Sequence, residues 1–499
     1  MASLLPTCIG DYCTETNDQS FLLRIDNASR KASETLARFK EVSGSPGVSI
    51  AVSYNHNVVW KTGVGWCDVE NMIPCTANSV MRIASISKPI TMTLVAKLVD
   101  ENKLDLDADV RRYLPDFPEK HVDGKKAVIT TRMLASHMSG IRHYKTKEYL
   151  EVEASKKNCE MCGAPVKTNA TEYEMKEVYN MKQYKNLSES LKLFQDDSLL
   201  SVPGTKYHYS TYAWTVVAAI VEKITGERIE NLYDGLFREC EMHETSLDQN
   251  MLVTPNRCRY YYRIKGSKHR RAGVLDNVRS VNCSYKWSGG GIQSTVNDLV
   301  KFAQVWIDSY NSSLAHNSTT SQKCYLTKET VEECWRPQAV EVMQRADALK
   351  QTTTTESEHE RAAMKSVGLG WFVKPPNFDS GNLLEQSGTV WHSGGAVGTT
   401  SFLLIVLPTN AENDQSRQGY GCTDSDKDFD GKMKLGQRLH GGLVVAVLCN
   451  LQECRGIENL ARTIATIFFE EIVVREKSLV HKLQTSAAMV GSEAPATGG

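Results

Sequence analysis

The two longest apolar runs in the chain limit what it can fold into. SFLLIVL at 401–407 and LVVAVLC at 443–449 are far shorter than the roughly 20 residues that a helix needs to cross a bilayer, so we expect buried strands. Near the other end, residues 46–66 are rich in β-forming residues on both sides of Asn55, His56 and Asn57, which predicts a hairpin. The sheet would then be closed by elements that are distant in the sequence.

A helix is predicted to cover that sheet, because residues 456–474 carry apolar side chains at mostly helical spacing. The middle of the chain is mostly helical and carries polar insertions. We therefore expect an N-terminal extension at 1–37, a catalytic domain at 38–475 with insertions near 144–190, 340–366 and 409–440, and a flexible C-terminal tail at 476–499.

Composition excludes several classes of partner. With 58 basic and 59 acidic residues interspersed along the chain, we expect neither nucleic-acid binding nor a polybasic membrane patch.

The 14 cysteines are scattered, which favours reduced thiols. The lone CxxC at Cys159 and Cys162 has no second pair or nearby histidine to complete a zinc site, so no metal is expected. No Lys or Arg precedes Arg24, which favours an intracellular protein without a readable targeting signal.

Ser85 and Lys88 lie three residues apart in RIASISKPIT. Proline is tolerated in the first turn of a helix, so Pro89 places a helix start near Ser85. Residues three apart share one helical face, and a partly buried amine can take or relay the proton of a serine hydroxyl. Ser85 is thus a candidate nucleophile whose own N–H could also bind an oxyanion. A capping serine followed by an exposed lysine is the alternative.

Tyr209 and Thr211 stand on a predicted turn in YHYSTYAWTVVAAIVEKITG, before an apolar helix that ends at Gly226. A tyrosine beside a lysine ammonium becomes more acidic, because positive charge favours the phenolate. Tyr209 is therefore a candidate general base for Ser85. A packed tyrosine beside an ST-turn is the alternative.

His392 and the glycines that follow it precede a strand in VWHSGGAVGTTSFLLIVLP. Glycines let a substrate approach the backbone closely. The N–H of Gly395 is thus a candidate second oxyanion donor beside that of Ser85.

The order of these motifs resembles the serine β-lactamase and penicillin-binding-protein superfamily: SxxK at Ser85, YxT at Tyr209, and HSG at His392 in place of KTG. LASHMSGIRHY and YKWSGGGIQSTVNDLVKFAQ resemble, more narrowly, its class C-like serine β-lactamase-like branch from animal mitochondria.

The resemblance implies an α/β sandwich with an antiparallel sheet built from both chain ends, helices on each side, and a mainly helical lobe. It implies Ser85 as the acylated nucleophile, Lys88 as proton relay and Tyr209 as general base. It also implies substrate contacts at Thr211, His392 and Ser393, and no cofactor. A homo-oligomer or filament and a mitochondrial location are implied as well, whereas the N-terminus alone favours the cytoplasm.

The departures bear on the substrate. His392 is mostly neutral near pH 7, unlike the usual lysine of KTG, so a peptide, amide or small ester is a better candidate than a β-lactam. We therefore expect a serine hydrolase of the peptidase, amidase or esterase kind. The alternative is an assembling scaffold with weak or no catalysis.

Overall fold

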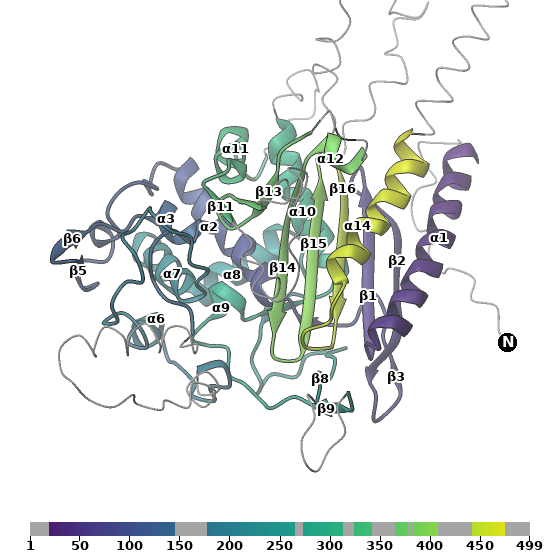
Figure 1. Cartoon of the computed structure of the whole chain (residues 1–499), viewed down its shortest axis with the longest axis horizontal. Helices are drawn as coiled ribbons and strands as arrows, with labels where there is room; N and C mark the ends of the chain where they lie inside the picture. Colours follow the sequence, from purple (N-terminus) through teal and green to yellow (C-terminus); the bar gives the residue numbers. More distant parts are fainter. Residues whose placement is uncertain are drawn as a thin grey trace, which may run out of the picture.

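Both ends of the chain contribute to one large sheet (Figure 1). The computed structural model describes residues 19–144, 177–264, 273–312, 324–341, 365–377, 380, 383–407 and 442–474. Within them the sheet has 9 strands, and every neighbouring pair is antiparallel. In spatial order these are β11 (Ala339–Glu341), β12 (Lys365–Val367), β13 (Phe372–Lys374), β14 (Thr389–Ala396), β15 (Thr399–Val406), β16 (Leu443–Cys449), β1 (Gly47–Tyr54), β2 (Asn57–Asp68) and β3 (Ile73–Pro74).

The predicted strands and hairpin are confirmed. The two apolar runs form β15 and β16, which pair with each other, and β16 pairs in turn with β1 of the N-terminal hairpin. Along β15, Phe402 and Leu404 pack on one face of the sheet while Leu403 and Ile405 pack on the other. Successive side chains of a strand point to opposite faces, so an unbroken apolar run fits a strand that is covered on both sides.

One face of the sheet is covered by two helices from opposite ends of the chain, α1 (Gln19–Ser43) and α14 (Ile457–Phe468), which also pack on each other (Figure 1). The predicted C-terminal helix is thus confirmed, and a π-helical segment, Phe469–Val474, extends it. The expected boundary between residues 37 and 38 falls inside α1, whose Ala28, Ala32 and Leu36 are fully buried.

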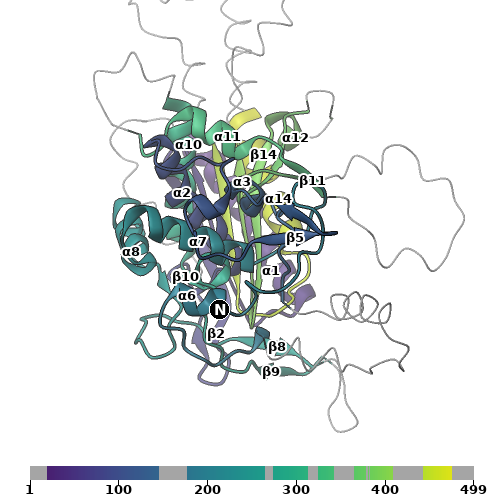
Figure 2. The same cartoon turned by 90° about the vertical axis from the view of Figure 1, so that its left-hand side faces the viewer.

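The opposite face supports the helical lobe (Figures 1 and 2). Its longer helices are α2 (Ser87–Asp100), α7 (Tyr212–Thr225), α8 (Ile229–Glu239), α10 (Val296–Asn311) and α11 (Lys328–Trp335). Shorter turns are η1 (Ala84–Ile86), η2 (Val110–Arg112), α3 (Thr131–Ala135), α6 (Leu187–Leu191), α9 (Trp287–Gly290) and, by the sheet, α12 (Leu383–Ser387). Small sheets are formed by β4 (Met81–Arg82), β10 (Ile292–Ser294) and β7 (Ser246–Leu247), by β5 (Lys120–Val122) and β6 (Lys125–Ala127), and by β8 (Tyr261–Arg263) and β9 (Leu275–Asn277).

The insertions interrupt elements that pair in space. Residues 342–364 connect β11 to β12, and residues 408–441 connect β15 to β16. Within the range predicted for the insertion near 144–190, Tyr184 and Leu187 are buried in the lobe. Most of these insertions, the segment 476–499 and the CxxC at Cys159 and Cys162 lie outside the described residues.

No helix in the described part of the chain is long and apolar enough to cross a membrane.

Candidate active site

Ser85 sits in the 3-10 turn η1, directly before α2. The α-helix begins two residues after the predicted start, at Ser87, and Pro89 occupies its first turn. Ala84 has a φ of 51°. This left-handed conformation is energetically unfavourable for a residue that has a side chain, and it often marks a functional site. The Ser87 hydroxyl stabilises the turn by donating to the Ala84 carbonyl at 2.7 Å. Ser85 itself is partly exposed, so a substrate can reach it.

Lys88 and Tyr209 converge on the Ser85 hydroxyl. Lys88 Nζ donates to Ser85 Oγ at 2.9 Å, and the Tyr209 hydroxyl donates to the same oxygen at 2.6 Å. Lys88 Nζ also donates to the Gly289 carbonyl at 2.5 Å and lies 4.8 Å from the centre of the Tyr209 ring. The structure thus brings together the three residues that the motifs single out, at distances over which a proton can pass.

Lys88 is fully buried. Burial, and then the nearby charge of Lys286, hold the pKa of Lys88 well below its usual range. Lys286 is also buried, yet its pKa is raised, with Tyr144 its main favourable neighbour, so it keeps its charge. A neutral Lys88 amine has a lone pair that can accept a proton from Ser85.

Tyr209 lies on the turn before α7, as predicted, and two histidines flank its ring. The ring of His137 lies 4.4 Å from that of Tyr209, and His143 stands edge-on to it at 5.6 Å. His137 Nδ1 accepts from the Ser210 N–H at 3.1 Å, and His143 Nδ1 accepts from the Thr211 N–H at 3.2 Å. The sequence alone indicates no role for these histidines, because only their place in LASHMSGIRHY distinguishes them.

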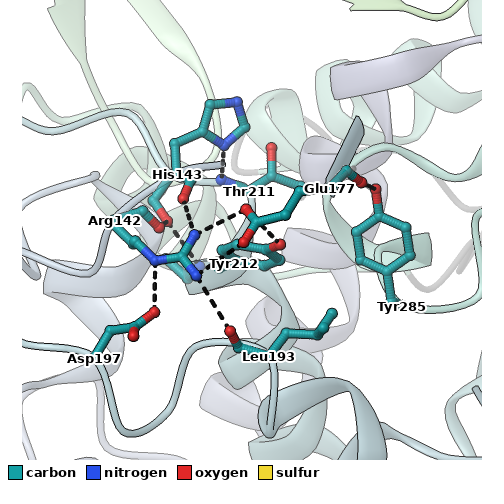
Figure 3. Close-up of polar contacts among 10 residues, drawn as sticks. Arg142, His143, Glu177, Leu193, Asp197, Thr211, Tyr212 and Tyr285 are labelled. Carbon is teal, nitrogen blue, oxygen red and sulfur yellow. Dashed lines mark hydrogen bonds and ion pairs between the residues drawn. The ribbon is translucent and has the colours of Figure 1, made fainter. Parts of the chain in front are cut away.

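Arg142 ties this turn to the rest of the lobe (Figure 3). Its side chain is 1% exposed and binds Glu177 at 3.0 Å and Asp197 at 2.6 Å. It also donates to the His143 carbonyl at 2.8 Å, while its own carbonyl accepts from the Ser210 hydroxyl at 2.7 Å. Two carboxylates with several hydrogen bonds compensate the burial of one guanidinium, so the segment that carries His143 is held from several sides.

Thr211 and Gly289 close the inner wall of the site. Thr211 is 4% exposed, and a β-carbon at Gly289 would lie 2.5 Å from Thr211 Cγ2. A glycine is therefore required at position 289 to bring its carbonyl to Lys88. Thr211 packs below the surface, so little of its side chain is exposed for the predicted contact with substrate.

Strand β14 borders the site from the sheet. A β-carbon at Gly394 would lie 2.4 Å from the Ile83 carbonyl, and the Ser401 hydroxyl of β15 donates to that carbonyl at 2.7 Å. Arg82 adds a second link, because it donates to the Val397 carbonyl at 2.9 Å and pairs with Asp248 at 2.7 Å. These contacts bring β14 against the residues that precede Ser85.

The pairing of β13 with β14 ends at Trp391. Residues 392–396 of β14 therefore leave one edge without a strand partner among the described residues, and alternate N–H groups of a strand face each edge. Ser393 and Gly395 are exposed there, whereas His392 is 2% exposed. Burial, with the charge of Lys88 second, lowers the pKa of His392 to about 3, so its ring is neutral.

No cluster of three or more His, Cys, Asp or Glu side chains within the described ranges could hold a metal ion.

The fold and these side chains together define a class, the serine hydrolases built on the β-lactamase and transpeptidase fold. The chain belongs to the Beta-lactamase family, which matches residues 33–464.

Two sequence relatives and one solved structure are similar to the chain. The chain is 33% identical over 473 residues to the human (Homo sapiens) mitochondrial serine beta-lactamase-like protein LACTB, covering 87% of this chain and 78% of that protein. It is 27% identical over 190 residues to Esterase EstB of Burkholderia gladioli, covering 38% of this chain and 44% of that one. The octameric penicillin-binding protein homologue from Pyrococcus abyssi shares the fold with a TM-score of 0.57 at 18% identity, covering 88% of this chain and 77% of the homologue.

Proposed function

We propose that the protein hydrolyses peptide, amide or small ester bonds through an acyl-enzyme formed on Ser85. The observation that carries the proposal is the convergence of the Lys88 amine, at 2.9 Å, and the Tyr209 hydroxyl, at 2.6 Å, on Ser85 Oγ. A capping serine would leave its lysine in solvent, whereas Lys88 is fully buried.

In the first half-reaction, Ser85 Oγ attacks the carbonyl carbon of the substrate while its proton passes to the Tyr209 and Lys88 pair. The carbonyl oxygen becomes negatively charged, and the N–H groups of Ser85 and Gly395 donate to it. The carbonyl carbon then loses its amine or alcohol leaving group, which takes the proton from the same pair. Water repeats these steps on the acyl-enzyme, releases the acid and restores Ser85.

The residues of β14 favour a substrate whose binding does not depend on a lysine at position 392, where the HSG motif starts. His392 is buried and neutral. We infer that its side chain packs on the buried side of β14 and that Ser393 and Gly395 contact the substrate. Esterase EstB, a relative over part of the chain, supports including esters among the substrates.

The test is hydrolysis of an activated acetate ester and of a panel of fluorogenic peptides by the wild type, Ser85→Ala and Tyr209→Phe. We expect turnover by the wild type, none above background by Ser85→Ala, and a loss of about 100-fold or more in Tyr209→Phe, because general-base catalysis contributes 10²–10⁴-fold. Equal turnover by the wild type and Ser85→Ala would contradict the proposal.

We also propose, from the family resemblance, that the protein forms a homo-oligomer in mitochondria. The mass of the wild type and of Ser85→Ala, measured by light scattering, tests the assembly. If the wild type is catalytically inert but assembles, and Ser85→Ala assembles equally well, the scaffold alternative holds instead.

A further inference from the structure

We propose that His143 is a positioning residue for Tyr209 and that it acts as a permanently neutral hydrogen-bond acceptor. This proposal rests on the proposed function, because it concerns how the general base is held against Ser85. A backbone N–H can only donate, so the contact from the Thr211 N–H at 3.2 Å fixes the state of the ring. Nδ1 carries the lone pair, and the proton of the neutral ring is on Nε2.

His143 accepts at a point where the chain needs an acceptor. α7 begins at Tyr212 with Thr211 as its N-cap, and the Thr211 side chain makes no capping hydrogen bond. The first N–H groups of a helix have no partner within the helix. The Ser210 hydroxyl satisfies one of them, the Ala213 N–H, at 3.0 Å. The two imidazoles satisfy the N–H groups of Ser210 and Thr211, the two residues that follow Tyr209.

The electrostatics of the site keep this acceptor available. Burial, followed by the charges of Lys88 and Lys286, lowers the pKa of His143 to about 3. A protonated ring would lose the acceptor and would place a second positive charge near that of Lys286. The ring therefore remains an acceptor through the physiological range.

The segment that carries His143 is rigid enough to transmit this restraint. Arg142 holds the His143 carbonyl and both carboxylates of Glu177 and Asp197 (Figure 3), and Ser210 is bonded back to the Arg142 carbonyl. Tyr209 is thus held between two fixed points, its hydroxyl at Ser85 and its following backbone at His143. A displacement of about 1 Å at a catalytic group can cost about 100-fold in rate.

Two substitutions at position 143 distinguish the role of the hydrogen-bond acceptor from the role of the ring. His143→Asn keeps an oxygen near the place of Nδ1 but removes the ring, whereas His143→Phe keeps an edge-on ring against Tyr209 but removes the acceptor. His143 is better suited to this pair than His137, because His137 has a φ of 62°, which asparagine tolerates and phenylalanine does not. The exposed His243 receives the same two substitutions as a control.

The first readout is the rate constant for labelling of Ser85 by a fluorophosphonate. We expect His143→Phe to label at least about tenfold more slowly, the cost of one buried hydrogen bond, and His143→Asn to stay within about threefold of wild type. A slow His143→Asn with a normal His143→Phe would overturn the proposal, as would equal rates in the two variants.

The second readout does not depend on catalysis. Amide hydrogen exchange of a peptide spanning 207–214 should speed up in His143→Phe and stay near wild type in His143→Asn. If the wild type takes no label, the proposed function fails and this exchange pattern alone decides the role of His143. Equal exchange in both variants would show that His143 does not hold the turn.

Discussion

At the scale of single residues, the chemistry of the site depends on the burial of Lys88, which disfavours the charged form of its amine. Lys88 is fully buried, and its pKa lies well below the usual range because of burial and the charge of Lys286. The neutral amine predominates above that lowered pKa, so the rate of acylation should rise with pH through it.

Lys286→Met should move this rise to higher pH. Removing the neighbouring charge stabilises protonated Lys88 and raises its pKa, so a larger fraction of Lys88 is protonated at a given pH. The measurement is the fluorophosphonate labelling rate between pH 5 and 9, with Lys301→Met as the matched control outside the site. An unchanged profile in Lys286→Met would show that Lys286 does not tune Lys88.

Gly289→Ala should damage both labelling and stability. Its new methyl group would lie 2.5 Å from Thr211 Cγ2 and 2.9 Å from the Thr211 carbonyl, and overpacking of this kind costs about 1–3 kcal/mol. The shift also displaces the carbonyl that Lys88 contacts, so labelling should slow about tenfold or more. Gly290→Ala is the matched control, because its nearest neighbour would be 3.9 Å away. Labelling kinetics and urea unfolding should separate the two variants, and similar behaviour of both would contradict the assignment.

At the scale of elements, the strand pattern and the motifs predicted different parts of the molecule. The runs that form β15 and β16 can be predicted as strands from the sequence. Both faces of these strands are buried, so the residues on both sides are apolar and the sequence is an unbroken apolar run. The turn positions of Ser85 and Tyr209 follow from Pro89 and from the apolar stripe of α7. His143 and Arg142 could not be assigned, since their roles depend on contacts with Thr211, Glu177 and Asp197, which are distant in the sequence.

The packing of α14 on the sheet should contribute to stability without affecting the site. Ile464 is fully buried in this layer, whereas Ile467 is partly exposed. Ile464→Ala should lower the free energy of unfolding by about 2–5 kcal/mol, and Ile467→Ala by less than half as much. Urea unfolding measures both, and the labelling rate at Ser85 should stay at the wild-type value. Slower labelling in folded Ile464→Ala would show that this face is coupled to the site.

At the scale of the whole molecule, buried neutral histidines make stability depend on pH. Burial lowers the pKa of both His143 and His392 to about 3, whereas an unfolded histidine titrates near 6.5. Between these values the unfolded chain binds more protons than the folded one, so stability falls as pH decreases below about 6.5. The slope is about 1.4 kcal/mol per pH unit for each such histidine.

His392→Asn should reduce that slope by the contribution of one histidine. Urea unfolding at intervals between pH 6 and 4.5 measures the difference from the wild type, and the exposed His243, replaced by Asn, is the control. An identical slope in the wild type and His392→Asn would show that folding does not lower the pKa of His392.

The most direct test of an activated Ser85 is intact-mass analysis after treatment with a fluorophosphonate probe, comparing the wild type with Ser85→Ala and Lys88→Ala. We predict that the wild type gains the mass of one phosphonyl group, that peptide mapping locates it on Ser85, and that both variants stay unlabelled. A folded wild type that takes no label, or a label that persists in Ser85→Ala, would contradict the assignment of Ser85 as the nucleophile.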